Sequence, residues 1–186
     1  MRSKLQTVLV LVVTTILIVG GVILVRAPWK TPSGVSSIEV SVDPNQPAPR
    51  VGSKAPEFAA ITIDDEVIYN KELLGKPVWL VFGATWCPNC RAEAADVEEV
   101  AKTYEGRVAV LSVYSGEDPD LVTGYAQRLG LTHIQVPDPL KEMTAAYQVM
   151  GLPTHIMIDS QGTVTQIIQG PLSKSKASEL LDALLG

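Results

Sequence analysis

The chain has 186 residues, with 15 Lys and Arg against 20 Asp and Glu and a formal net charge of −5 at pH 7. This length fits one ordinary domain with an appended segment. Residues 51–186 hold eighteen acidic side chains against ten basic ones, so most of the chain offers no electrostatic footprint for nucleic acid. Nucleic-acid binding is therefore excluded as a function.

The chain opens on an apolar segment. Residues 5–25 include no charged side chain, and a helix of that length, at ~1.5 Å rise per residue, spans a hydrocarbon core of about 30 Å. A cleaved signal peptide has an apolar part of only about 7–15 residues and ends at a small-residue site, which Arg26-Ala27-Pro28 does not provide. We predict an uncleaved membrane anchor over residues 1–25, with a cleaved signal as the alternative.

Basic residues flank this segment unevenly. Arg2, Lys4 and the terminal amine precede it, whereas Arg26 and Lys30 follow it. The positive-inside rule therefore favours a cytoplasmic amino end by a small margin. The chain would then be a single-pass protein of the cell membrane, with its main domain outside the cytoplasm, where stable disulfides persist.

A proline-rich segment follows the anchor. Residues 26–50 contain five prolines among Ser, Thr, Gly and Asn. Such a segment buries too little apolar surface to fold alone and is typical of a semi-rigid linker. The globular domain is predicted to cover residues 51–186.

This domain alternates between strand and helix patterns. Residues 78–82 are a continuous apolar run, as expected of a strand buried on both faces. Residues 88–105 place apolar side chains at helical spacing. Further patterns predict a hairpin (58–63, 66–69), strands (108–113, 134–136, 154–158, 164–168) and helices (120–129, 140–149, 176–185). Strands that alternate with helices and end in a hairpin imply an α/β fold, a mixed sheet sandwiched by helices.

Both cysteines stand in the motif Trp86-Cys87-Pro88-Asn89-Cys90, between a buried strand and an amphipathic helix. In this context a C-x-x-C pair indicates redox chemistry. Pro88 suits the first helical position, so Cys87 lies at the helix amino terminus, where free N–H groups and the helix dipole favour a thiolate. Cys90 lies one turn later, close enough to form a short disulfide. We predict that Cys87 is the exposed attacking thiol and Cys90 the shielded resolving thiol.

Other uses of the two cysteines fit less well. Zinc needs about four ligands, and the two histidines, His133 and His155, are distant in sequence and are expected to be ordinary packed or surface residues. A c-type haem site would have His after the second cysteine, where Arg91 stands. A purely structural bridge over so small a loop would restrain little unfolded-chain entropy. We therefore predict no metal and no organic cofactor besides the redox-active disulfide.

The segment from Phe82 to Glu93 resembles the active-site stretch of the TlpA/ResA-like, extracytoplasmic branch of the thioredoxin superfamily. The resemblance continues through Gly151-Leu152-Pro153 and residues 159–162, and covers most of residues 51–186. It implies a thioredoxin-like fold and a protein thiol–disulfide oxidoreductase. It also implies that Pro153 is a cis-proline facing the redox pair, and that Leu152 offers backbone hydrogen bonds to a substrate.

One departure from plain thioredoxins concerns the proton acceptor. Plain thioredoxins bury an acid in the strand before the motif, whereas Val81 stands at the matching place here. In the TlpA/ResA-like branch a glutamate three residues after the second cysteine takes that role, and the resemblance assigns it to Glu93. Because residues i and i+3 share a helix face, Glu93 could accept a proton from Cys90. A solvated helix glutamate is the alternative.

The predicted reaction is disulfide exchange with client proteins. By resemblance the clients are extracytoplasmic, with apocytochrome c the leading candidate, and a membrane-bound thiol donor reduces the oxidised pair again. Trp86, Pro88 and Leu152 are predicted to form the substrate-binding surface. Pro88-Asn89 between the cysteines tunes the reduction potential, so the preferred direction of exchange stays open.

Two other functions stay open. Residues 51–58 form an opening that peroxiredoxins also use, but peroxide reduction would want a Thr-x-x-Cys loop, and Thr85 stands only two residues before Cys87. A copper-binding or metallochaperone module using Cys87 and Cys90 is the second. Copper titration of the reduced protein separates that module from an oxidoreductase.

Overall fold

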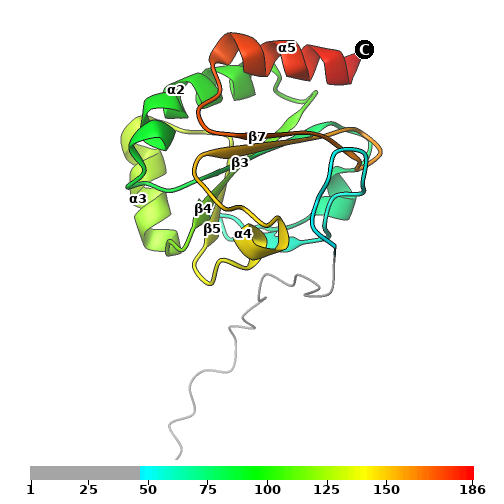
Figure 1. Ribbon diagram of the computed structural model, residues 1–186. Coiled ribbons are helices and arrows are strands. Elements are labelled where there is room, and N and C mark those ends of the chain that lie inside the picture. Colours follow the sequence, from blue (N-terminus) through cyan, green and yellow to red (C-terminus); the bar gives the residue numbers. More distant parts are fainter. Residues whose placement is uncertain (1–46) are drawn as a thin grey trace, which may run out of the picture. The chain divides into compact units, whose positions relative to one another are not determined.

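Residues 47–186 are described by the computed structural model of the chain (Figure 1). The predicted membrane anchor at residues 1–25 lies outside this range, as do residues 26–46 of the predicted linker. Within the described range, no helix is long and apolar enough to cross a membrane.

Five strands form the central sheet, in the order β5-β4-β3-β6-β7. β3 (Val78–Gly83) pairs in parallel with β4 (Ala109–Ser115), which pairs in parallel with β5 (Ile134–Asp138). On its other side β3 pairs antiparallel with β6 (Thr154–Ile158), which pairs antiparallel with β7 (Val164–Gln169). The predicted mixed sheet is confirmed.

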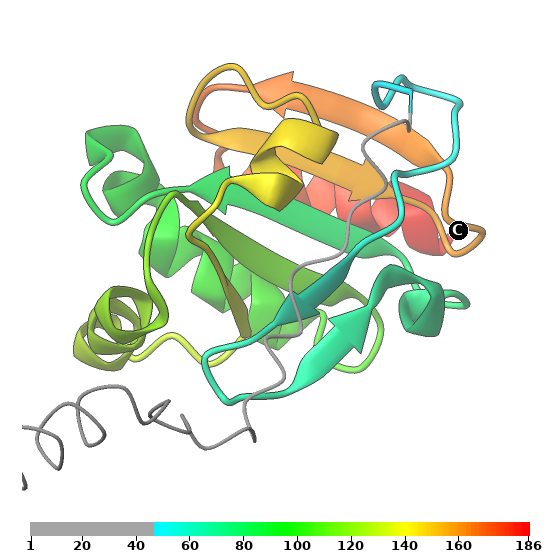
Figure 2. The same cartoon turned by 90° about the horizontal axis from the view of Figure 1, so that it is seen from below.

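Helices cover both faces of this sheet. α2 (Pro88–Thr103) and α5 (Lys174–Leu185) lie above it in Figure 1, and α4 (Glu142–Ala146) lies below it. The view from below shows α4 in front of the strands and α5 behind them (Figure 2). α3 (Pro119–Leu129) connects β4 to β5. The predicted sandwich of helices around a sheet is therefore confirmed.

The segment before the central sheet is a small hairpin of β1 (Ala59–Ile61) and β2 (Val67–Tyr69), followed by the 3-10 helix η1 (Asn70–Leu73). The sequence pattern predicts the hairpin but not η1, because η1 has no buried residue to mark it.

The helix predicted over residues 140–149 is shorter in the structure, where only α4 is helical. Lys141 and Gln148, on either side of it, have positive φ angles of 59° and 49°. A left-handed residue interrupts a right-handed helix, so the helical periodicity extends further than the helix does.

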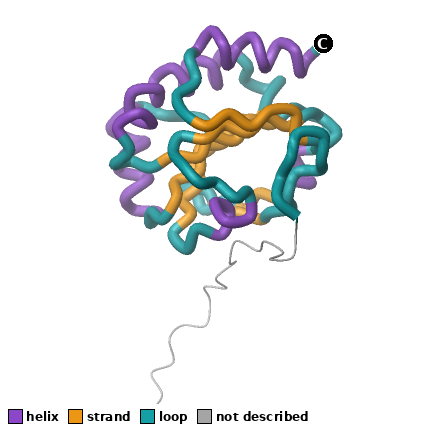
Figure 3. The backbone as a smooth tube through the Cα atoms, in the orientation of Figure 1, coloured by secondary structure: helices purple, strands orange, loops and turns teal. Residues whose placement is uncertain are grey.

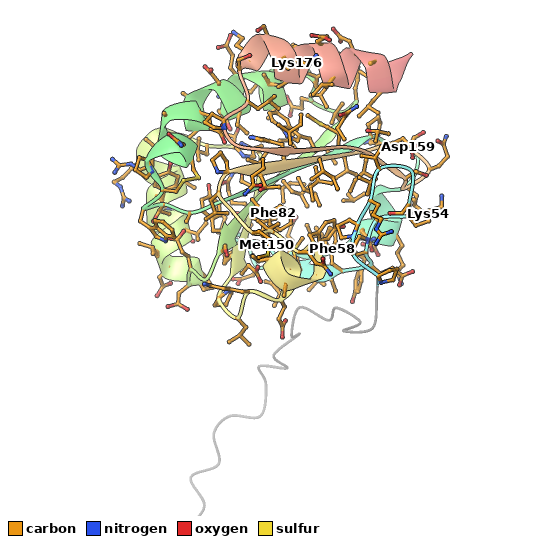
Figure 4. All side chains as sticks on the ribbon, viewed as in Figure 1. Lys54, Phe58, Phe82, Met150, Asp159 and Lys176 are labelled. Atoms are coloured by element: carbon orange, nitrogen blue, oxygen red, sulfur yellow. A yellow bond between two sulfur atoms is a disulfide. The ribbon has the colours of Figure 1, made fainter. Side chains whose placement is uncertain are left out.

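Alternate residues of β3 point to opposite faces of the sheet and so join two separate cores. Leu80 and Phe82 pack on the α4 side with Phe58, where Figure 4 labels both phenylalanines. Trp79 and Val81 pack on the other side, against side chains of α2 and α5. Each central strand therefore presents side chains to both layers of helices.

The loops of the candidate site lie at one edge of the sheet, where β3 and β4 end and β6 begins. Phe82, near the end of β3, pairs with Thr154 at the start of β6, and Gly83 pairs with Tyr114 near the end of β4. The loops that leave these strand ends are drawn in teal in Figure 3. The cysteine motif and Pro153 both lie at this edge.

Candidate active site

A disulfide joins Cys87 and Cys90 at the start of α2, with 5.3 Å between their Cα atoms. Pro88 is the first helical residue, as predicted, and Cys87 is the N-cap. The Cys87 sulfur accepts the backbone N–H of Cys90 at 3.3 Å. A sulfur in this position faces N–H donors and the positive end of the helix dipole, which stabilise negative charge. The geometry therefore favours a thiolate at Cys87 once the disulfide opens.

The exposure of the two cysteines differs from the prediction. Cys87 is 4% exposed, whereas Cys90 is partly exposed. The prediction of an exposed Cys87 and a shielded Cys90 is wrong for this disulfide form. The cause is the capping geometry, because the Cys87 side chain turns back over the first turn of α2. Exposed surface is contributed instead by Trp86, at 67%, and by Pro88.

The peptide bond between Leu152 and Pro153 is cis, so the predicted cis-proline is confirmed. The next residue, Thr154, pairs with Phe82 of β3, which places this bond at the edge of the sheet where the cysteine loop begins. Gly170 donates its N–H to the Pro153 carbonyl at 2.8 Å. Hydrogen bonding of Leu152 to a substrate stays a prediction.

Glu93 is buried one helical turn beyond Cys90, with 6% of its surface exposed. Its Oε2 accepts the backbone N–H of Leu172 at 3.2 Å, and its Oε1 lies 3.5 Å from Nε2 of His155. The alternative of a solvated surface glutamate is therefore wrong. Glu93 and Cys90 also line one cavity of about 30 Å³, which is room for about one water molecule.

His155 is a residue whose place at the site the sequence analysis missed. It is fully buried, its ring lies 5.8 Å from the Trp79 ring, and it pairs with Val81 across β3 and β6. Val81 is the place where plain thioredoxins bury their acid, so Glu93 and His155 together occupy that region. The available signal was a titratable ring in an otherwise apolar strand directly after Pro153.

Glu117 is a second missed residue at this edge. It is buried just after β4 and accepts two hydrogen bonds from Thr85, one from the backbone N–H at 2.8 Å and one from the hydroxyl at 2.6 Å. Hydrogen bonds to a carboxylate are stronger than neutral ones. They hold the loop two residues before Cys87. An acid directly after a buried strand, at the edge where β3 ends, was the available signal.

A second glutamate of α2, Glu98, also faces a histidine. Its Oε2 lies 2.7 Å from Nδ1 of His133 and accepts the N–H of Thr132 at 2.9 Å. Its Oε1 accepts the Thr132 hydroxyl at 2.6 Å and lies 2.9 Å from Nζ of Lys102. Nε2 of His133 in turn lies 2.7 Å from the Ser112 hydroxyl. Every polar atom of this second pair is therefore hydrogen-bonded.

The electrostatics of this second pair follow from these contacts. Burial alone would raise the pKa of Glu98, but the hydrogen bonds from Thr132, His133 and Lys102 hold it well below its usual range. Burial lowers the pKa of His133, although the hydrogen bond and the charge of Glu98 act in the opposite direction. The pair is thus a carboxylate beside a neutral imidazole.

Comparison with known proteins identifies the family. Residues 51–167 match the AhpC/TSA family. The chain belongs to this family. The thiol-disulfide oxidoreductase ResA of Geobacillus kaustophilus (strain HTA426) is 35% identical over 135 residues, which cover 72% of this chain and 78% of that protein. The thioredoxin-like protein YneN of Bacillus subtilis (strain 168) is 34% identical over 134 residues, which cover 70% and 78%.

Solved structures of thiol:disulfide interchange proteins are also similar to this chain. A thiol:disulfide interchange protein of the thioredoxin family from Chlorobium tepidum TLS superposes with a TM-score of 0.67 at 29% identity, covering 75% of this chain and all of that one. This AhpC/TSA family member is accordingly a thiol–disulfide oxidoreductase of the ResA and thioredoxin type, with a thioredoxin-like fold and Cys87 and Cys90 at disulfide distance.

Proposed function

We propose that this oxidoreductase is anchored in the cell membrane, acts outside the cytoplasm and reduces disulfides in client proteins, with apocytochrome c as the leading client. The observation that carries the disulfide exchange is the position of the Cys87 sulfur, which caps α2 and accepts the N–H of Cys90. This environment stabilises the attacking thiolate. The apolar segment at residues 5–25 supports the anchor.

Exchange proceeds in two steps. The Cys87 thiolate attacks one sulfur of the client disulfide, which forms a mixed disulfide and releases the first client thiolate. Cys90 then loses its proton to Glu93 and attacks the Cys87 sulfur. The Cys87–Cys90 disulfide closes and the second client thiolate leaves. Two electrons pass to the client, and a membrane-bound thiol donor returns the pair to its reduced form.

The client docks at the edge of the sheet that holds the disulfide. Trp86 offers a large exposed ring beside Cys87, and Pro88 lies next to it at the surface. Leu152 directly precedes Pro153 and β6 (Thr154–Ile158) at the same edge, and in this proposal its backbone pairs with an extended client segment. An exposed aromatic ring suits an apolar client side chain.

The direct test uses the reduced 186-residue chain in detergent and a peptide with the haem-binding C-x-x-C-H sequence of an apocytochrome c in its disulfide form. We expect stoichiometric release of peptide thiols, faster than from a disulfide peptide of scrambled sequence. A reduction potential of the Cys87–Cys90 pair too high to reduce the peptide would contradict the reducing direction. Equal rates with both peptides would contradict the choice of client.

The anchor and its orientation need a separate test. We expect the expressed chain to stay in the membrane fraction after an alkaline wash, and a protease added to spheroplasts to remove residues 51–186. A protein recovered without residues 1–25 would instead show a cleaved signal.

Peroxide reduction and copper binding are the rival activities. Thr85, which stands one residue too close to Cys87 for a peroxidatic Thr-x-x-Cys loop, donates its hydroxyl to Glu117. Among residues 47–186 no group of three or more His, Cys, Asp or Glu side chains is arranged to hold a metal ion. Rapid oxidation of the reduced chain by hydrogen peroxide would favour the peroxiredoxin function. Tight stoichiometric copper binding with poor disulfide reduction would favour the metallochaperone function.

A further inference from the structure

Glu93 and His155 form a buried pair behind the disulfide. His155 is fully buried and Glu93 is 6% exposed, and Oε1 of Glu93 lies 3.5 Å from Nε2 of His155. In the part of the chain that the structure describes, neither nitrogen of His155 nor Oε1 of Glu93 has a hydrogen-bond partner. Only Oε2 of Glu93 is bonded, to the Leu172 N–H.

This arrangement is costly if its only role is packing. A buried polar atom without a partner loses its hydration and gains nothing in return. Ile156, Met157 and Ile158, the next residues of β6, are all buried and apolar, and an apolar side chain in place of His155 would avoid the cost. A histidine here points to a function that needs the ring nitrogens.

We propose that Glu93 and His155 act as one acid–base unit, which holds the proton removed from Cys90 when the mixed disulfide is resolved. A proton between Oε1 and Nε2 gives each of these unpaired atoms its missing partner, after a small closure of the 3.5 Å gap. Without His155, Oε1 would have no neighbouring side chain among the described residues to accept that proton. Glu93 is the group that exchanges the proton, and His155 is its positioning residue.

The inference rests on the proposed exchange reaction, and its steps balance. Cys90 gives its proton to the Glu93–His155 pair, and the resulting thiolate attacks the Cys87 sulfur. The Cys87–Cys90 bond forms while the bond between Cys87 and the client breaks, and the client sulfur leaves as a thiolate. The pair then returns its proton to solvent or to that thiolate, so no further oxidant or reductant is required.

The other titratable side chains around the cavity beside Cys90 are less suited than the Glu93–His155 pair to exchange a proton with it. Cys90 and Glu93 share the cavity of about 30 Å³, which also touches Tyr114, Tyr125 and His133. Burial raises the pKa of both tyrosines, so they stay neutral. His133 is bonded to Glu98 and has a lowered pKa.

Across the sheet, the strands packed against β6 contribute no charge at His155. Its cross-strand partners are Val81 on β3 and Ile168 on β7. Trp79 supplies a ring 5.8 Å away. Among the described side chains, the charged group that lies against His155 is therefore the Glu93 carboxylate, 3.5 Å from Nε2.

The first experiment uses the small number of histidines. The chain has two, so its imidazole NMR spectrum has two sets of ring signals, and His133→Gln assigns them. We expect the ring signals of His155, in the full chain in detergent, to respond to pH differently in the oxidised and the dithiothreitol-reduced protein. Glu93→Gln should remove this difference. Identical titrations in both redox states would overturn the proposal.

The second experiment measures closure of the disulfide. Reduced protein is converted to a mixed disulfide with a small aromatic disulfide, and release of the aromatic thiol is followed against pH. His155→Phe keeps a ring against Trp79 but removes both nitrogens. We expect closure to slow by about 10-fold, below the range for loss of a general base itself, and to need a higher pH. His155→Gln, a polar variant that does not titrate, should show the same altered pH profile as His155→Phe.

A double-mutant cycle separates relay from packing. If His155 acts through Glu93, His155→Phe should have no further effect on closure in the Glu93→Gln background. Additive effects, or an unchanged pH profile in His155→Phe alone, would overturn the proposal while disulfide exchange stands. Loss of exchange with every disulfide in the wild type would instead overturn the proposed function, and the NMR titration would still report on the pair.

Discussion

Two glutamates of α2 each face a histidine whose side chain is buried, and the two pairs differ in how completely they are hydrogen-bonded. Glu98 and His133 lie 2.7 Å apart, and Thr132 and Lys102 complete the hydrogen bonds of the carboxylate. Glu93 and His155 lie 3.5 Å apart and leave three buried polar atoms without a partner among the described residues. Both carboxylates are equally buried, so burial alone does not separate them.

The difference shows how a function can be located within a buried polar cluster. A pair whose polar atoms are all bonded has one preferred protonation state and holds it, as Glu98 and His133 do when they join α2 to the segment before β5. A pair with free atoms can take up a proton between them without breaking an existing hydrogen bond. We therefore assign a structural role to the Glu98 pair and proton exchange to the Glu93 pair.

The largest expected effect on disulfide reduction comes from replacing the cysteines. The comparison of the two Glu–His pairs depends on their roles. Cys87→Ser should abolish disulfide reduction, because the nucleophile is lost. Cys90→Ser should trap a mixed disulfide through Cys87, which mass spectrometry of the intact chain detects. Normal turnover of Cys90→Ser, or fastest alkylation of Cys90 in the reduced wild type, would show that the two roles are reversed.

Matched substitutions in the two pairs should have opposite consequences. Glu93→Gln should slow closure of the disulfide by about 100-fold, the lower bound for loss of a general base, with little change in stability. Glu98→Gln should leave closure unchanged but lower the free energy of unfolding by about 2 kcal/mol, because the neutral amide makes weaker hydrogen bonds with Thr132 and His133 than the carboxylate does. Stopped-flow closure and urea unfolding of the oxidised protein measure both. A stability loss in Glu93→Gln with unchanged closure would reverse our assignment.

The fold could be predicted because burial leaves a pattern in the sequence. Residues 78–82 and 88–105 carry the apolar runs of β3 and α2, and both elements appear where those patterns place them. The contact between Glu93 and His155 could not be predicted in this way. It depends on the pairing of β3 with β6 and on which face of the sheet α2 covers, and neither is encoded locally in the strand that carries His155.

The predicted exposure of the cysteines failed for a related reason. The motif fixes Pro88 at the first helical position, but it does not specify where the Cys87 side chain points. In the structure that sulfur turns toward the Cys90 N–H and becomes buried. The cis bond before Pro153 came from the family resemblance, because most X–Pro bonds are trans.

The pH dependence of stability should follow the Glu98 pair. The pKa of His133 is lowered from 6.5 and that of Glu98 from 4.5 in the folded protein. On acidification the unfolded chain therefore binds protons before the folded chain does, so the free energy of unfolding falls below pH 6.5 and falls further below pH 4.5. Urea unfolding of the oxidised protein at several pH values measures this slope. An equally steep slope below pH 4.5 in Glu98→Gln would assign that part of the dependence to other groups.

The smallest expected effect concerns the ion pair of Glu98 with Lys102. The Lys102 side chain is 57% exposed and reaches Oε1 at 2.9 Å, whereas Thr132 donates its hydroxyl to the same oxygen at 2.6 Å and its backbone N–H to Oε2 at 2.9 Å. Water and salt screen the exposed ion pair, so Lys102→Met should lower the free energy of unfolding by no more than about 0.5 kcal/mol. Thr132→Val should cost about 1.5 kcal/mol, because it removes a hydrogen bond to a buried charge. Urea unfolding of both variants at low and high salt measures the two losses. A larger loss in Lys102→Met than in Thr132→Val would mean that Coulomb attraction to the lysine, and not the hydrogen bonds from Thr132, keeps the Glu98 carboxylate ionised.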